Sequence, residues 1–106
     1  MEESKQKPLE KKIITALRTV FDPEIPVNVY DLGLIYEINI DDSSNVQIVM
    51  TLTNPNCPVA DQLIVDVRDI VKTVGGVDKV EVKLVFEPVW TKDNMSDAAL
   101  LDLGLL

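Results

Sequence analysis

The stretch "LIYEINIDDSSNVQIVMTLT", residues 34–53, decides the fold, because an apolar residue recurs at every second position in both of its halves. This is the spacing of a strand with one buried face. The residues between the halves, "DDSSN", are polar turn formers. The stretch therefore predicts a β-hairpin with a longer turn. The face turned toward the core would carry Leu34, Tyr36, Ile38, Ile40, Val46, Ile48, Met50 and Leu52.

Two segments with helical spacing flank this hairpin. The upstream helix is expected to begin at Pro8, whose missing N–H costs nothing in a first turn, and to end near Phe21. The downstream helix is expected from Pro58 to Val74, and the pair Gly75-Gly76 ends it. The upstream apolar stripe is Leu9, Ile13, Ile14, Leu17, Val20 and Phe21, and the downstream one is Val59, Leu63, Val67, Ile70, Val71 and Val74.

A third strand and a short helix follow. "KVEVKLVFE", residues 79–87, alternates again and would turn Phe86 toward the core, and "SDAALLDL", residues 96–103, is a short helix with Ser96 as its N-cap. The order α-β-β-α-β-α predicts an α+β two-layer sandwich, with a small three-stranded sheet and the helices on one face. Residues 1–7 would be a flexible N-terminal tail and residues 8–106 a single domain.

The second face of the predicted sheet is mixed in character. Ile35, Val49 and Val85 would lie there among polar residues, one on each strand. An apolar patch of this kind often marks an interface. Because a net charge of −8 opposes self-association, a weak homodimer or a basic protein partner is favoured over a tight homodimer. Trp90 is expected to anchor the C-terminal segment.

The composition excludes several classes of protein. The charge of −8 argues against nucleic-acid binding and against an anionic membrane surface. No apolar run reaches the roughly 18 residues of a membrane span, and the polar start does not resemble a signal peptide. The single cysteine, Cys57, cannot form an internal disulfide. We therefore expect a cytoplasmic protein.

Cys57 precedes Pro58 and would be the N-cap of the downstream helix. The helix start favours a thiolate and should lower the thiol's pKa, whereas Asp61 opposes this. Cys57 is therefore either a small apolar filler or a nucleophile or metal ligand. The chain has no histidine, which excludes a Cys-His pair, and one cysteine cannot build a zinc site. An iron–sulfur cluster takes about four thiolates, so the missing ligands would come from elsewhere.

Three motifs together resemble the SufT/PaaD-like iron–sulfur cluster assembly domain family. They are "DPEIPVNVYDLGLIYEI", "TLTNPNCPVADQ" and "WTKDNMSDAALLDLGLL", and the resemblance runs from about Leu9 to the C-terminus, closest to the single-domain bacterial SufT-type proteins. It implies a non-enzymatic accessory factor that works beside iron–sulfur scaffold proteins and recipient apoproteins. The cofactor it implies is a transient iron–sulfur cluster on Cys57, and no other is expected.

The resemblance also maps a supporting pocket onto this chain, formed by Asp22, Glu24, Asp31, Thr51 and Thr53. Each residue has a structural alternative. Asp22 and Asp31 could cap turns, Glu24 could be a solvated surface charge, and threonine is a common strand residue.

Two other functions stay open. The first is a protein-interaction adaptor in the assembly of a multicomponent oxygenase or another metalloenzyme, with an incidental thiol. The second is a thiol-based redox enzyme, which is disfavoured because no second cysteine could resolve a mixed disulfide. Substitution of Cys57 separates the adaptor from the assembly factor, because an adaptor would keep its function.

Overall fold

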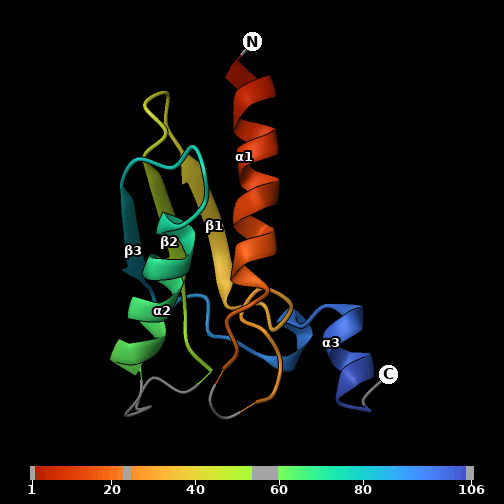
Figure 1. Ribbon diagram of the computed structural model, residues 1–106. Coiled ribbons are helices and arrows are strands. Elements are labelled where there is room, and N and C mark those ends of the chain that lie inside the picture. Colours follow the sequence, from red (N-terminus) through yellow and green to blue (C-terminus); the bar gives the residue numbers. More distant parts are fainter. Residues whose placement is uncertain (1, 23–24, 54–59, 105–106) are drawn as a thin grey trace.

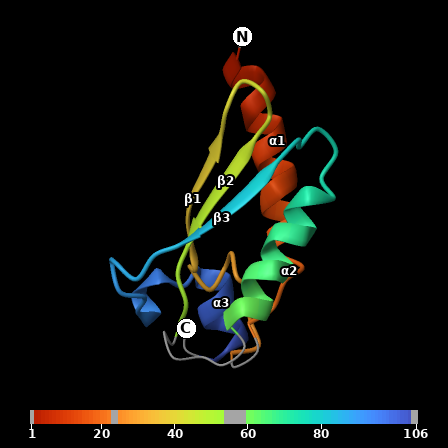
Figure 2. The ribbon, with the colours of Figure 1, turned by 90° about the vertical axis from the view of Figure 1, so that its left-hand side faces the viewer.

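The computed structural model describes residues 2–22, 25–53 and 60–104, and it confirms the predicted α+β sandwich. Helices α1 and α2 lie on the same side of a three-stranded sheet (Figures 1 and 2). In chain order the elements are α1 (Glu2–Leu17), β1 (Ile35–Ile40), β2 (Val46–Met50), α2 (Ala60–Lys72), β3 (Val80–Leu84), the 3-10 turn η1 (Lys92–Asn94) and α3 (Asp97–Asp102).

The sheet has the order β1-β2-β3. β1 and β2 form the predicted antiparallel hairpin, in which Ile38 lies opposite Ile48. β3 runs parallel to β2, with Val82 opposite Ile48. A parallel pair needs a crossover connection, and α2 provides it. β2 is therefore the central strand, and its end leads directly into the segment that carries Cys57.

The core forms where the two long helices cover the sheet. On α1, Leu9, Ile13 and Leu17 are buried, and on α2, Leu63, Val67 and Val71 are buried. Both sets recur at intervals of four residues, which keeps them on one side of a helix. They pack with Val46, Ile48 and Met50 of β2 in one cluster. Of the stripe predicted for the downstream helix, Leu63, Val67 and Val71 are buried and Ile70 packs against the cluster, but α2 ends at Lys72, so Val74 packs against the core from the turn that follows.

The bounds predicted for the first helix are wrong at both ends. α1 begins at Glu2, and Pro8 lies inside it instead of opening it. The residues before Pro8 are mostly good helix formers, and this favours continuation of the helix. The helix also ends at Leu17, so Phe21 is not part of its buried stripe and exposes 59% of its surface. That residues 1–7 are flexible stays a prediction.

Strand alternation fails at two places. The register of β1 and β2 shifts between Ile35 and Glu37, so the predicted faces do not hold there. Ile35 packs against the core cluster, whereas the Tyr36 hydroxyl donates to the Pro88 carbonyl at 2.6 Å. A bulge of this kind re-aims side chains. β3 ends at Leu84, and Phe86, predicted to face the core, is 48% exposed.

The C-terminal segment turns around the lower end of the sheet toward the face that the helices leave open (Figure 2). Trp90 anchors it as predicted, because its Nε1–H donates to the Leu32 carbonyl at 2.7 Å. The predicted N-cap of the last helix is also confirmed, since the Ser96 hydroxyl accepts from Ala99 N–H. Among the helices of the described residues, none combines the length and the apolar composition that a membrane span requires.

Candidate functional site

The loop between α1 and β1 carries three of the predicted site residues, Asp22, Glu24 and Asp31, and its described part is held by backbone hydrogen bonds. Val29 N–H donates to the Val20 carbonyl at 2.8 Å, and Asp22 N–H donates to the Val27 carbonyl at 3.2 Å. Phe21 forms a bridge with Asn28 between these two bonds. The loop is therefore a small hairpin of its own.

Asp22 lies near the tip of this small hairpin and is only 8% exposed. Its Oδ2 accepts a hydrogen bond of 2.9 Å from the backbone N–H of Ile25. This is the turn-capping geometry that an aspartate before proline often adopts. The carboxylate is thus fixed in orientation by the loop that carries it.

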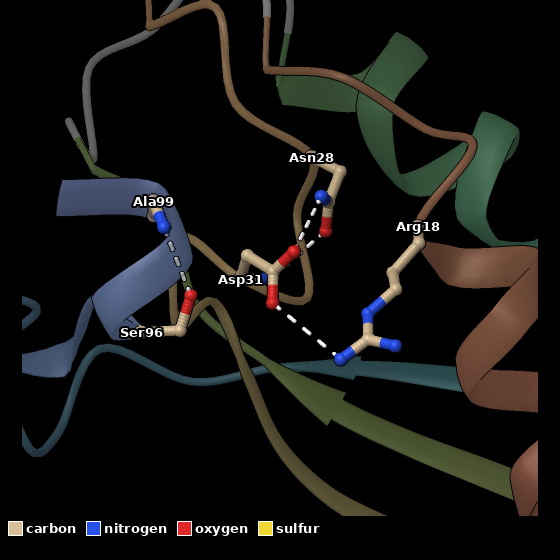
Figure 3. A network of polar contacts seen from close by, with 5 residues as sticks. All are labelled: Arg18, Asn28, Asp31, Ser96 and Ala99. Atoms are coloured by element: carbon tan, nitrogen blue, oxygen red, sulfur yellow. Dashed lines mark hydrogen bonds and ion pairs between the residues drawn. The ribbon is translucent and has the colours of Figure 1, made fainter. Parts of the chain in front are cut away.

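Asp31 lies at the other end of the loop, within a network that joins three parts of the chain (Figure 3). Its Oδ2 accepts from the Asn28 side-chain amide at 2.8 Å, and its N–H donates to Asn28 Oδ1 at 2.8 Å. The Arg18 guanidinium lies 3.7 Å from Asp31 Oδ1. The Asp31 carbonyl accepts from Ser96 N–H at 2.8 Å. Asp31 therefore connects the end of α1, the loop and the start of α3.

Arg18 has a second contact that fixes its position. Its guanidinium lies over the Tyr30 ring, 5.1 Å from the centroid. Arg18 and Asn28 position Asp31, and sequence reasoning missed both. The spacing of Asn28 and Asp31 is a turn signal that could have revealed the first, because asparagine side chains bond to nearby backbone groups. The approach of Arg18 to Asp31 has no comparable local signal.

Thr51 and Thr53 follow the end of β2. Thr51 is 1% exposed, and its N–H donates to the Leu34 carbonyl at 2.9 Å, which ties this end of β2 to the end of the loop. Its hydroxyl is therefore not open to solvent. Thr53 is partly exposed and is the last described residue before Ala60.

Cys57, which is the predicted N-cap of the downstream helix, lies outside the described residues, and so does Glu24. Within residues 2–22, 25–53 and 60–104 no three histidine, cysteine, aspartate or glutamate side chains are grouped so that they could hold a metal ion. The structure brings the loop and the end of β2 together through Thr51 and Leu34. It places Asp31 toward α1 and α3 and Asp22 toward the loop tip.

A hollow of about 780 Å³ lies on the open face of the sheet, on the side away from α1 and α2. Val49, Lys83 and Val85 are on its sheet side, and Pro88 and Asn94 of the C-terminal segment are on its other side. Of the apolar residues predicted for this face, Val49 and Val85 line the hollow, and Ile35 borders it while also packing against the core cluster. The second face thus has the mixed character that the sequence predicts.

Comparison with known proteins finds close relatives over nearly the whole chain. Residues 10–84 match the family described as iron–sulfur cluster assembly protein. The "Fe-S protein maturation auxiliary factor" of Porphyromonas gingivalis is 57% identical over 97 residues, which cover 92% of each chain. The "Fe-S protein maturation auxiliary factor YitW" of Bacillus subtilis is 37% identical, over 92% of this chain and 95% of the relative. The crystal structure of a DUF59 domain from Bacillus anthracis superposes with a TM-score of 0.87 at 38% identity, covering 94% and 95% of the two chains.

Proposed function

This chain belongs to the iron–sulfur cluster assembly protein family, and from this premise we propose that it is an accessory factor in the assembly of iron–sulfur clusters or in their delivery to apoproteins. The observation that carries the proposal is the family match over residues 10–84, which includes Cys57 and the loop with Asp22 and Asp31. Two relatives that match over more than nine-tenths of both chains are named maturation auxiliary factors. These names describe helpers of maturation, and we propose a non-enzymatic role here.

Cys57 is the residue that we assign to the cluster. A cluster is usually held by four thiolates, whereas this chain has one cysteine and no histidine. The other ligands would come from a scaffold protein, a recipient apoprotein or a second copy of the chain. The cluster is then cargo held in passing by two proteins. Such a transfer belongs in the cytoplasm, where cysteines stay reduced.

The described structure fixes both ends of the connection that carries Cys57. This connection runs from β2 to α2, and both elements are anchored in the core, by Met50 at 0% and Leu63 at 4% exposure. The Thr51 N–H also bonds to the Leu34 carbonyl, at the end of the loop that begins near Asp22. The motif that contains Cys57 thus starts at Thr51, which is bonded to the end of this loop.

Replacement of Cys57 in cells tests the proposal. We expect Cys57→Ser to lower the activities of iron–sulfur enzymes while the protein stays folded, because serine is of similar size and a good N-cap. Protein level and melting temperature serve as controls. Normal enzyme activities in a strain that carries only the serine variant would contradict the ligand role and favour an adaptor with an incidental thiol.

Reconstitution in vitro gives a second readout. Wild type and Cys57→Ala are incubated without oxygen with iron and sulfide, and their visible absorption spectra are compared. We expect charge-transfer bands in the wild type and their loss in the variant. Equal spectra would show that any bound iron does not depend on Cys57.

A further inference from the structure

Phe21 exposes 59% of its surface, although phenylalanine is a residue type that protein cores readily take up. Its neighbours Val20 and Asp22 expose only 9% and 8%. The backbone explains the contrast, because residues 20–22 pair with residues 27–29 as a short ladder. Side chains alternate along extended chain, so the two neighbours face inward and Phe21 faces outward. Its exposure is built into the loop.

A groove of about 340 Å³ lies beside Phe21, between the segment that follows α1 and the side of α2. α2 contributes Asp66, Asp69 and Ile70 to it, and Thr73 lies just beyond the end of α2. Residues three and four positions apart lie on one side of a helix, so the three residues of α2 share a face. Val20 belongs to the buried core cluster and Ile70 packs against it, which gives the groove an apolar base.

The charge of the groove is negative. Asp66 and Asp69 are exposed, and no lysine or arginine is among the described residues that line it. The Gln62 amide donates to Asp66 Oδ1 at 2.8 Å, which leaves the charge of that carboxylate in place. Arg68 Nε lies 3.8 Å from Asp69 Oδ1, and both side chains are more than half exposed. An exposed pair of this length is weak, so both carboxylates can take a new partner.

The two threonine hydroxyls of the groove already have acceptors. Thr19 Oγ1 donates to the Ala16 carbonyl, and Thr73 Oγ1 donates to the Ile70 carbonyl, each at 2.6 Å. A hydroxyl has one proton to donate, and here it is used within the helix end. The two hydroxyls can therefore only accept from a ligand, beside the aromatic ring, the apolar base and the two carboxylates.

We propose that this groove docks an arginine side chain presented by a basic protein partner. A guanidinium stacks on an aromatic face and donates several hydrogen bonds in its plane, so it can contact Phe21 and the carboxylates of Asp66 and Asp69 together. The net charge of −8 attracts such a partner from a distance. Only the identity of the partner rests on the proposed function: it would be a protein that supplies or receives the cluster.

The test uses the full chain and a synthetic peptide in which arginine alternates with leucine. Its addition should shift the NMR signals of Phe21, Asp66, Asp69 and Ile70. Matched peptides with lysine or glutamate in place of arginine are the comparison. We expect the lysine peptide to bind about two- to fivefold more weakly, because an ammonium lacks the planar fork. The glutamate peptide should not bind.

Variants then assign the binding to the groove. Phe21→Ser should weaken the arginine peptide by about tenfold, because it removes both the ring face and apolar contact. Asp66→Asn should weaken it by about two- to fivefold. Phe86→Ser is the matched control, since Phe86 is also an exposed phenylalanine, at 48%, but does not line the groove. Melting temperatures verify that each variant is folded.

Three results would overturn the inference. The first is a set of shifts that maps away from the groove, and the second is unchanged affinity in Phe21→Ser. The third is self-association without peptide that Phe21→Ser abolishes, because the occupant would then be a second copy. A separate result would contradict the proposed function. It is intact enzyme maturation in Cys57→Ser, even if the peptide binds. Loss of maturation in Cys57→Ser with no peptide binding would overturn the docking site alone.

Discussion

The indole Nε1–H of Trp90 donates a hydrogen bond of 2.7 Å to the backbone carbonyl of Leu32. Two further bonds fasten the same segment, from the Tyr36 hydroxyl to the Pro88 carbonyl at 2.6 Å and from Ser96 N–H to the Asp31 carbonyl at 2.8 Å. The C-terminal segment is therefore held against the loop that leads into β1. These bonds add to the burial of Met95 and Ala99, which packs the start of α3 into the core.

Trp90→Phe tests the contribution of the indole donor, because phenylalanine keeps an aromatic ring but cannot donate. We expect a loss of about 1 kcal/mol in the free energy of unfolding, the usual value of such a hydrogen bond. Chemical denaturation measures it. Val89→Ala is the control, since Val89 is 74% exposed in the same segment and its change should have little effect. Equal stability of Trp90→Phe and wild type would show that ring packing alone anchors the segment.

Gly33→Ala tests the close approach between the loop and the C-terminal segment. Gly33 has φ +86, and a Cβ there would clash with the backbone carbonyl of Asn94. We expect a loss of more than about 2 kcal/mol, because a positive φ alone costs about 1–2 kcal/mol for a residue with a Cβ. Gly104→Ala isolates that cost, since Gly104 has φ +74 and nothing lies within 4 Å. Similar losses in both variants would mean that Asn94 moves aside freely.

The fold was largely predictable, because period-two and helical spacings are local signals. The hairpin over residues 34–53, the buried face of α2 and the Ser96 cap all follow from neighbours in the chain. The residues at which helices and strands end could not be predicted from these spacings. Phe21 keeps helical spacing with Leu17, yet the helix has already ended, and Phe86 continues the alternation of β3 beyond its last pair. Where an element ends depends on contacts with distant residues, and a pattern does not contain them.

For the candidate site, the sequence indicated residues but not the contacts that they make. Asp31 was identified, but its contact with Arg18 depends on how α1 meets the loop, which no spacing reveals. The burial of Thr51 likewise depends on the approach of the Leu34 carbonyl. The roles of Cys57 and Glu24 stay predictions, because both lie outside the described residues.

Asp41 predicts a pH dependence of stability. The backbone and side chain of Asn45 donate hydrogen bonds to its carboxylate, with a further bond from Ser43 N–H, and these hold the pKa of Asp41 below its usual value. A lowered pKa in the folded state stabilises the fold above the unfolded-state pKa of about 3.9. This contribution is lost as the pH falls through the folded-state pKa.

Asp41→Asn should therefore be less stable than wild type at neutral pH, and the difference should shrink in acid. Melting temperatures measured from neutral pH down to about pH 3 test this. Asp42→Asn is the matched control, because it removes the same charge from an exposed position of the same turn. A difference between Asp41→Asn and wild type that does not change with pH would mean that the amide perturbs the turn by its shape.

Val49→Lys tests the open face of the sheet. The alternation of β2 places Val49 on the face away from the helices, where this change would barely alter stability, but Val49 is only 8% exposed, on the central strand between Glu37 and Lys83. We now expect a loss of about 1–2 kcal/mol, because apolar contact is lost while the ammonium can still reach water. Val89→Lys, at a position 74% exposed, is the control and should cost little. A loss above about 3 kcal/mol would place Val49 in the core. No loss at all would show that the hollow beside it opens readily to solvent.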